Sequence, residues 1–143
     1  MKRAILAAVA LALPACGDSS TAPSLSDLEG TWTMIEGVQS IVGDPASDFD
    51  LVDQGLGGTL SITSTGSFQL IIGASSGAPG FLVMTGSLTV DGANLQLTVG
   101  GATDAVPFTL QAGVLRLTIM DTDDVDNDGT DEDIRVVLAF ERD

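Results

Sequence analysis

The sequence has few of the residues that enzymes most often use for proton transfer and nucleophilic attack. Its 143 residues include no histidine, no tyrosine and a single cysteine. Without histidine, neither a Ser-His-Asp nor a Cys-His arrangement can form within the chain, and one cysteine excludes an internal disulfide. Carboxylate pairs remain, but no pair stands out from the acidic segments. The composition therefore predicts a protein that is not an enzyme.

Basic residues are also scarce, whereas acidic residues are abundant. The chain has 5 Lys and Arg against 20 Asp and Glu, which gives a formal net charge of −15. Such a surface repels nucleic acid and anionic lipid headgroups and favours cations or a cationic partner. Sixteen of the acidic residues are Asp, which favours turns and hard-cation sites over helices. We therefore expect little helix and no nucleic-acid partner.

The longest apolar run lies at the amino terminus. Lys2 and Arg3 precede ten apolar residues at positions 4–13, too few for a membrane-spanning helix, which needs about 20. A charged start followed by such a run is typical of a signal peptide. The next residues, Leu13-Pro14-Ala15-Cys16, resemble the lipobox of bacterial lipoproteins. The resemblance implies a lipoprotein signal peptide at residues 1–15 and a lipid anchor on Cys16.

An ordinary secretory signal, with Cys16 near its end by chance, is the alternative. With the anchor, the protein is expected to be attached to a membrane of the cell envelope, and Asp18, two residues after the cysteine, fits the outer membrane. Residues 16–24 are mostly small and polar, so they predict a flexible tether. One domain is then expected at residues 25–143.

From residue 28 onward, apolar and polar residues alternate, which is the pattern of strands with one buried face. Ser, Thr and Gln occupy most of the intervening positions. The pattern predicts an all-β fold of eight strands. Their inward positions are Leu28, Gly30, Trp32 and Met34; Leu60 and Ile62; Phe68, Leu70 and Ile72; Leu82, Met84, Leu88 and Val90; Leu95, Leu97 and Val99; Val106, Phe108 and Leu110; Leu115, Leu117 and Ile119; and Ile134, Val136, Leu138 and Phe140.

Short turns alternate with longer connections along these strands. Tight turns are expected at residues 65–66, 91–94 and 111–113, and longer loops at 37–58, 73–80, 100–104 and 121–133. In an up-and-down arrangement the two kinds fall at opposite ends, and an even strand number lets the first and last strands pair. We therefore predict an eight-stranded, up-and-down antiparallel β-barrel. A β-sandwich of the same strands is the alternative.

The segment Leu28-Glu29-Gly30-Thr31-Trp32, together with the hairpin pattern, resembles the lipocalin-like domains of bacterial lipoproteins. In that family a Gly-x-Trp motif begins the first strand, and the Trp plugs the closed end of the barrel. The resemblance implies this role for Gly30 and Trp32. It also implies that Arg142, which shares the parity of Phe140, stacks on the Trp as a cation–π partner.

A lipocalin-like barrel implies a binding module for a small hydrophobic ligand held in the barrel interior. The residues expected to line such a pocket are Met34, Leu60, Leu70, Leu82, Leu97 and Leu117. The alternative is that these side chains simply pack the core, because a small barrel can be filled by its own residues.

Residues 121–133 contain eight acidic side chains in thirteen positions. The Asp-x-Asp-x-Asp-Gly pattern within them is typical of calcium loops, in which oxygen ligands alternate and the glycine allows a sharp turn. This register predicts Ca²⁺ ligands at Asp124, Asp126, Asp128, Thr130 and Glu132. Arg135 stands where an EF-hand has its bidentate Glu, so the segment is not an EF-hand. The alternative is a solvated acidic loop whose Asp side chains cap turns.

A second acidic group, Asp44, Asp48, Asp50 and Asp53, is expected beside this segment if the barrel closes. Carboxylates crowded on one rim favour bound cations or a basic partner. The sequence thus leaves two functions open. One is a lipid-anchored module that binds a small hydrophobic ligand; the other is a cell-envelope structural or interaction protein with a filled barrel and a calcium-binding acidic rim.

Overall fold

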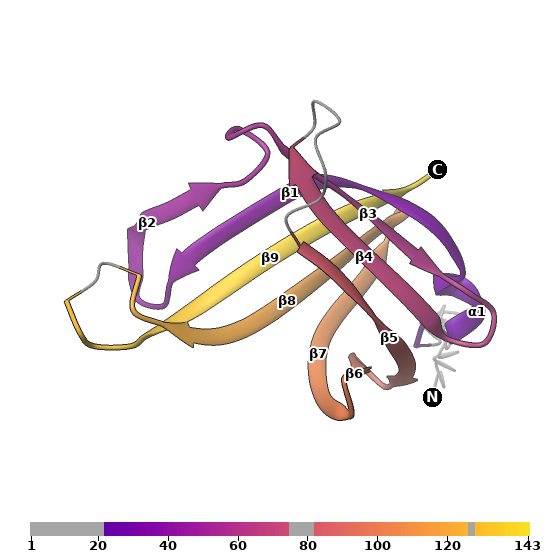
Figure 1. Cartoon of the computed structure of the whole chain (residues 1–143). Helices are drawn as coiled ribbons and strands as arrows, with labels where there is room; N and C mark the ends of the chain where they lie inside the picture. The colour runs from indigo at the N-terminus through magenta and orange to yellow at the C-terminus, as the bar shows by residue number, and fades with distance from the viewer. Residues whose placement is uncertain (1–21, 75–81, 126–127) are drawn as a thin grey trace, which may run out of the picture.

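The alternating segments form nine antiparallel strands in the computed structural model, which describes residues 22–74, 82–125 and 128–143 (Figure 1). One short helix, α1 (Leu25–Leu28), precedes them. The strands are β1 (Gly30–Ile41), β2 (Asp44–Asp50), β3 (Leu56–Ile62), β4 (Ser67–Ala74), β5 (Leu82–Asp91), β6 (Asn94–Val99), β7 (Ala102–Gln111), β8 (Val114–Asp123) and β9 (Glu132–Arg142).

Eight of these strands close into an up-and-down barrel. Each of β3 to β9 pairs with its neighbour in sequence, β1 pairs with β3, and β1 also pairs with β9 over nine residue pairs from Trp32↔Arg142 to Ile41↔Ile134. The last pairing joins the two ends of the sheet, which leaves β1 and β9 without the free edge that a two-sheet sandwich would have. The prediction of an eight-stranded antiparallel barrel is therefore confirmed.

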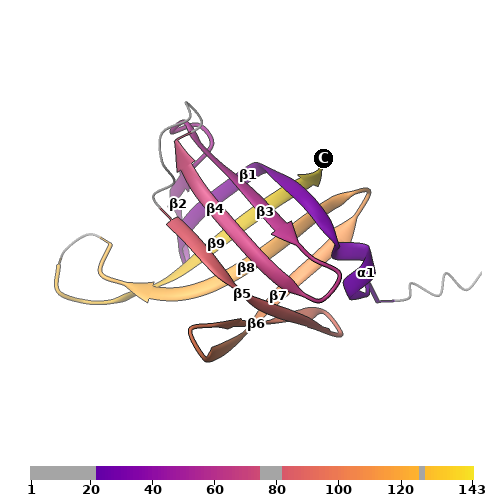
Figure 2. The ribbon, with the colours of Figure 1, turned by 45° about the vertical axis from the view of Figure 1, so that its right-hand side comes forward.

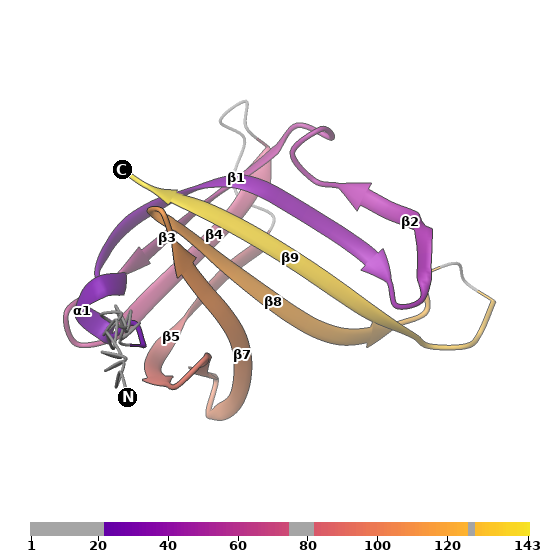
Figure 3. The same cartoon turned by 180° about the vertical axis from the view of Figure 1, so that it is seen from behind.

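The ninth strand, β2, lies outside the barrel, against the carboxy-terminal part of β1 (Figure 3). Its register runs from Val38↔Asp50 to Ile41↔Asp44, so the loop expected at residues 37–58 is wrong over most of its length. The segment lacks the alternation of a strand with one buried face, because β2 lies outside the barrel and its residues are mostly exposed on both faces. An edge also tolerates Pro45, which has no N–H to donate to a ladder.

The tight turns and α1 gather at one end of the barrel, here called the closed end (Figure 2). The turn between β3 and β4 bonds to β5 there, because Leu88 N donates to Gly66 O at 2.7 Å. Leu28 of α1 is fully buried and Leu25 packs against the same core. Among the residues that the structure describes, no helix has the length and apolar character needed to cross a membrane.

The connection expected at residues 100–104 is a two-residue turn instead of a longer loop. Val99 pairs with Ala102, so Gly100 and Gly101 alone join β6 to β7. Both glycines have positive φ, at 60° and 91°, as a turn of this kind requires at its two central positions. Glycine adopts such angles freely because it has no side chain. The pair Gly100-Gly101 therefore permits a two-residue turn.

A bulge in β1 sets up an ion pair across the barrel seam. The register shifts between Met34↔Phe140 and Glu36↔Ala139, and Arg116 also pairs with Ala139 from the β8 side. Arg116 reaches across this small residue to Glu36 with two hydrogen bonds of 2.6 and 3.0 Å. These bonds lower the pKa of Glu36 and raise that of Arg116. The pair ties β8 to β1 across β9.

Candidate ligand-binding site

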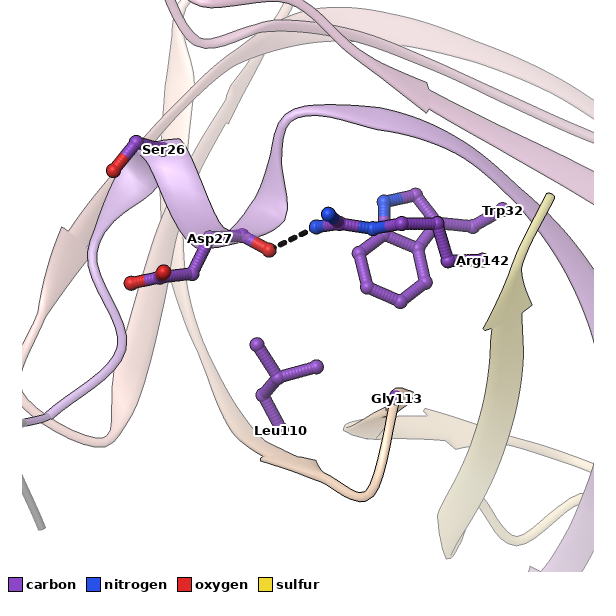
Figure 4. Close-up of a pocket in the computed structure, with 6 residues that line it drawn as sticks. All are labelled: Ser26, Asp27, Trp32, Leu110, Gly113 and Arg142. Atoms are coloured by element: carbon purple, nitrogen blue, oxygen red, sulfur yellow. Dashed lines mark hydrogen bonds between the residues drawn. The ribbon is translucent and has the colours of Figure 1, made fainter.

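At the closed end, Trp32 is buried beneath α1 and the last residues of β9 (Figure 4). Gly30, with φ of +133°, turns the chain from α1 into β1 and so brings Trp32 to the barrel axis. The indole Nε1 of Trp32 donates to Leu28 O at 2.9 Å, which satisfies the one polar atom of a side chain that is only 1% exposed. The plug is thus packed and hydrogen-bonded.

Arg142 covers the Trp32 indole from the solvent side. Its guanidinium carbon lies 4.6 Å from the ring centroid, within the range of a cation–π contact. Nη2 of Arg142 also donates to Asp27 O in α1 (Figure 4). The structure therefore brings together Gly30, Trp32 and Arg142, the three residues assigned to the closed end from the sequence, and joins them to α1.

Asp27 also caps the amino-terminal turn of α1 through its side chain. The Ser24 hydroxyl and backbone N–H both donate to Asp27 Oδ2, at 2.6 and 2.8 Å, and these bonds lower the pKa of Asp27. A shallow depression of about 330 Å³ remains at this end (Figure 4). Trp32 and Arg142 are among its lining residues, so the depression belongs to the surface of the plug.

The larger hollow lies toward the other end, where β7 and β8 diverge. The two strands pair only from Phe108↔Leu117 to Gln111↔Val114, and beyond that point they separate (Figures 1 and 3). Residues 102–107 of β7 stay with β6, and residues 118–123 of β8 stay with β9. The barrel wall is therefore open between two strand edges that face each other.

Pro107 marks the point at which the β7–β8 ladder ends. Phe108 N donates to Ala93 O at 2.9 Å, on the β6 side. Because successive residues of a strand direct their N–H groups to opposite sides, position 107 faces β8, and a proline has no N–H to offer there. The next rung of the ladder would pair Pro107 with Thr118, and it is missing.

The hollow between the diverging strands has a volume of about 570 Å³, within the usual range of ligand pockets. Its floor is apolar and comes from inward-facing side chains of four strands, while residues of outward parity on β7 and β8 line the opening through the wall. The lining residues are Met84, Leu97, Val99, Asp104, Ala105, Val106, Pro107, Thr118, Ile119, Met120 and Asp121.

Of the six residues expected to line a pocket, the structure places Leu97 on this hollow. Met34, Leu60, Leu70 and Leu117 instead lie in the packed core, each 6% exposed or less, and Leu82 is 36% exposed. Alternation identifies which side chains face inward, but it does not show where the strands separate. The one sequence signal for the hollow is a proline within a strand, Pro107.

The acidic loop between β8 and β9 brings three of the predicted ligands together. Carboxylate oxygens of Asp124, Asp128 and Glu132 lie within 4.8 Å of one another. Asp124 also accepts hydrogen bonds from the backbone N–H groups of Asp128 and Gly129, both at 3.0 Å. Thr130 N donates to Asp128 Oδ1 at 2.8 Å. Asp126, a further predicted ligand, lies outside the described residues, as does Cys16.

The acidic loop also lies beside the turn that leads from β1 to β2. Val42 N donates to Asp133 O at 2.8 Å, and Val125 shares a small hollow with Ser47 and Phe49 of β2. The part of β2 that carries Asp44 and Asp48 therefore lies beside the acidic loop, whereas Asp50 pairs with Val38 and lies near Glu36.

A scan against models of known protein families gave no match to this chain, and no curated protein is similar to it in sequence.

Proposed function

We propose that the protein is a non-catalytic binding module that takes a small hydrophobic ligand into the hollow between β7 and β8. The observation that carries the proposal is the combination of a plugged closed end with an open, largely apolar hollow of about 570 Å³ at a break in the wall. Apolar pockets of this size with a few polar groups at the mouth are the usual form of small-molecule sites. The plug also supports the lipocalin-like assignment, since Trp32 and Arg142 stack as that resemblance implies.

Filling the hollow is expected to weaken ligand binding. The variant Val99→Trp places a large side chain on the hollow floor, and we expect it to lower the affinity for the neutral apolar dye N-phenyl-1-naphthylamine by about tenfold or more, equivalent to about 1.4 kcal/mol. Fluorescence titration measures this affinity. Val83→Trp is the matched control, because Val83 is 58% exposed and does not line the hollow. If the dye binds both variants as well as the parent, the hollow is not the site.

The proposal places this module on a membrane of the cell envelope, with outer-membrane attachment through Cys16. The described chain begins at Ala22 and Pro23, which share a surface hollow with the β5–β6 turn at the closed end. A tether of residues 16–24 therefore joins the domain at the closed end. The hollow lies toward the opposite end and would face away from the membrane.

Lipid attachment is tested by the variant Cys16→Ser. We expect the parent protein to sediment with membranes and the variant to appear in the soluble fraction, because a stable anchor of this kind depends on acyl chains carried by the cysteine. Immunoblotting of both fractions from cells expressing each form measures the distribution. Retention of Cys16→Ser in the membrane pellet would contradict the anchor.

The second candidate is a cell-envelope structural or interaction protein with a calcium-binding rim, and the clustered oxygens of Asp124, Asp128 and Glu132 favour it. With a dissociation constant in the weak extracellular range, 10 mM Ca²⁺ should raise Tm by about 5 °C or more. The variant Asp124→Asn should lose most of this rise, whereas Asp53→Asn should keep it. Calorimetry in Ca²⁺ and in chelator measures the shift, and an equal shift in both variants would exclude the site.

A further inference from the structure

Two carboxylates stand at the mouth of the hollow, one on each of the diverging strands. Asp104 of β7 and Asp121 of β8 both line it, and both are exposed. They continue the inward-facing rows that begin deeper in the barrel with Val106 and Ile119. A ligand whose apolar part rests on Met84, Leu97 and Val99 would therefore have its polar end beside these carboxylates.

Among the described residues, no basic side chain lines the hollow beside these two carboxylates. The three arginines of the described chain make other contacts, although Arg135 pairs in the ladder with Met120 of the lining. Arg116 is paired with Glu36, Arg135 donates to Ser40 Oγ at 3.3 Å, and Arg142 lies over Trp32. The negative charge at the mouth is thus left for solvent ions or for a ligand.

We infer that the ligand is a cationic amphiphile, an apolar body with a protonated amine or quaternary ammonium head, and not a fatty acid or a neutral lipid. This inference rests on the proposed function. Its reason is charge complementarity: an ammonium group at a mouth lined by Asp104 and Asp121 is attracted by the negative charge there, whereas a carboxylate or phosphate head is repelled. The apolar floor supplies affinity that all three head groups share, and the carboxylates discriminate among them.

The head group is tested with three ligands of one chain length: decylammonium, decanol and decanoate, each below its micelle concentration. Displacement of N-phenyl-1-naphthylamine from the full domain measures their affinities at pH 7 and low salt. Taking about a fivefold gain from contact with one exposed carboxylate, we expect decylammonium to bind about fivefold more tightly than decanol, and decanoate more weakly than decanol. Added salt should reduce this preference, because the charges are accessible to solvent.

Two variants of equal charge assign the preference to these residues. The double variant Asp104→Asn, Asp121→Asn should bind decylammonium and decanol about equally, whereas Asp48→Asn, Asp53→Asn, which removes two carboxylates outside the hollow, should keep the preference. If decanol or decanoate binds as tightly as decylammonium to the parent protein, or if both double variants change alike, the cationic head is refuted and the hydrophobic site stands. If neither the dye nor any of the three ligands binds, the proposed function fails as well.

Discussion

Replacing Trp32 with alanine is expected to lower the free energy of unfolding by about 3–5 kcal/mol, the usual loss when a large buried aromatic side chain is removed. Trp32 is 1% exposed and fills the space between α1 and the barrel. The variant leaves a cavity at the closed end and removes the surface on which Arg142 stacks. It also leaves Leu28 O without its indole donor.

Urea denaturation followed by far-ultraviolet circular dichroism measures this loss, because Trp32 is the only tryptophan and its fluorescence disappears with the substitution. Trp32→Phe should fall between the parent and the alanine variant, since it keeps an aromatic face for Arg142 but not the N–H donor. Val83→Ala, on an exposed side chain, should change stability by less than about 0.5 kcal/mol. A loss below about 1 kcal/mol for Trp32→Ala would contradict the packed closed end.

The substitution Gly86→Ala is expected to destabilise the barrel by about 3 kcal/mol or more, at the upper end of overpacking effects. A Cβ atom at Gly86 would lie 2.1 Å from Thr98 O on β6 and 3.0 Å from Phe68 Cε1 on β4. The first contact is with backbone, which cannot rotate aside as a flexible side chain can. β5 and β6 approach this closely where the wall curves, and they would have to separate.

The matched control is Gly92→Ala in the turn between β5 and β6. Gly92 has φ of +60°, but a Cβ atom there would meet nothing within 4 Å beyond the two adjacent residues. Alanine at this position therefore incurs only the left-handed conformational penalty of about 1–2 kcal/mol. Urea denaturation of both variants separates steric clash from backbone strain. Equal losses in the two variants would show that the close approach at Gly86 is relieved without cost.

The strands of the barrel could be predicted from the sequence because each hides one face, so that side chains such as Leu115 and Leu117 recur at every second position. β2 could not be predicted in this way, because an exposed edge strand has no buried face to set the alternation. The bulge in β1, where Ile35 is the extra residue, could not be predicted from this alternation either. Its side chain is apolar and yet 46% exposed, so its polarity does not indicate the side of the strand on which it lies.

The two ends of the barrel also differ in how far they could be predicted from the sequence. The stack of Trp32 and Arg142 is what the lipocalin-like resemblance implies, and the parity of Arg142 and the pairing of the first and last strands agree with it. The hollow depends on how far β7 and β8 separate beyond Pro107, which is a property of curvature. Leu97 and Leu117 have the same parity, yet one lines the hollow and the other lies in the core.

The break in the wall also bears on solubility. Unpaired strand edges are templates for adding a strand from another molecule, which is a common route to aggregation. Here residues 102–107 and 118–123 are such edges, and Asp104 lies on one of them while Asp121 and Asp123 lie on the other. A second copy approaching edge to edge therefore meets charges of the same sign. This repulsion opposes strand addition between copies at the opening.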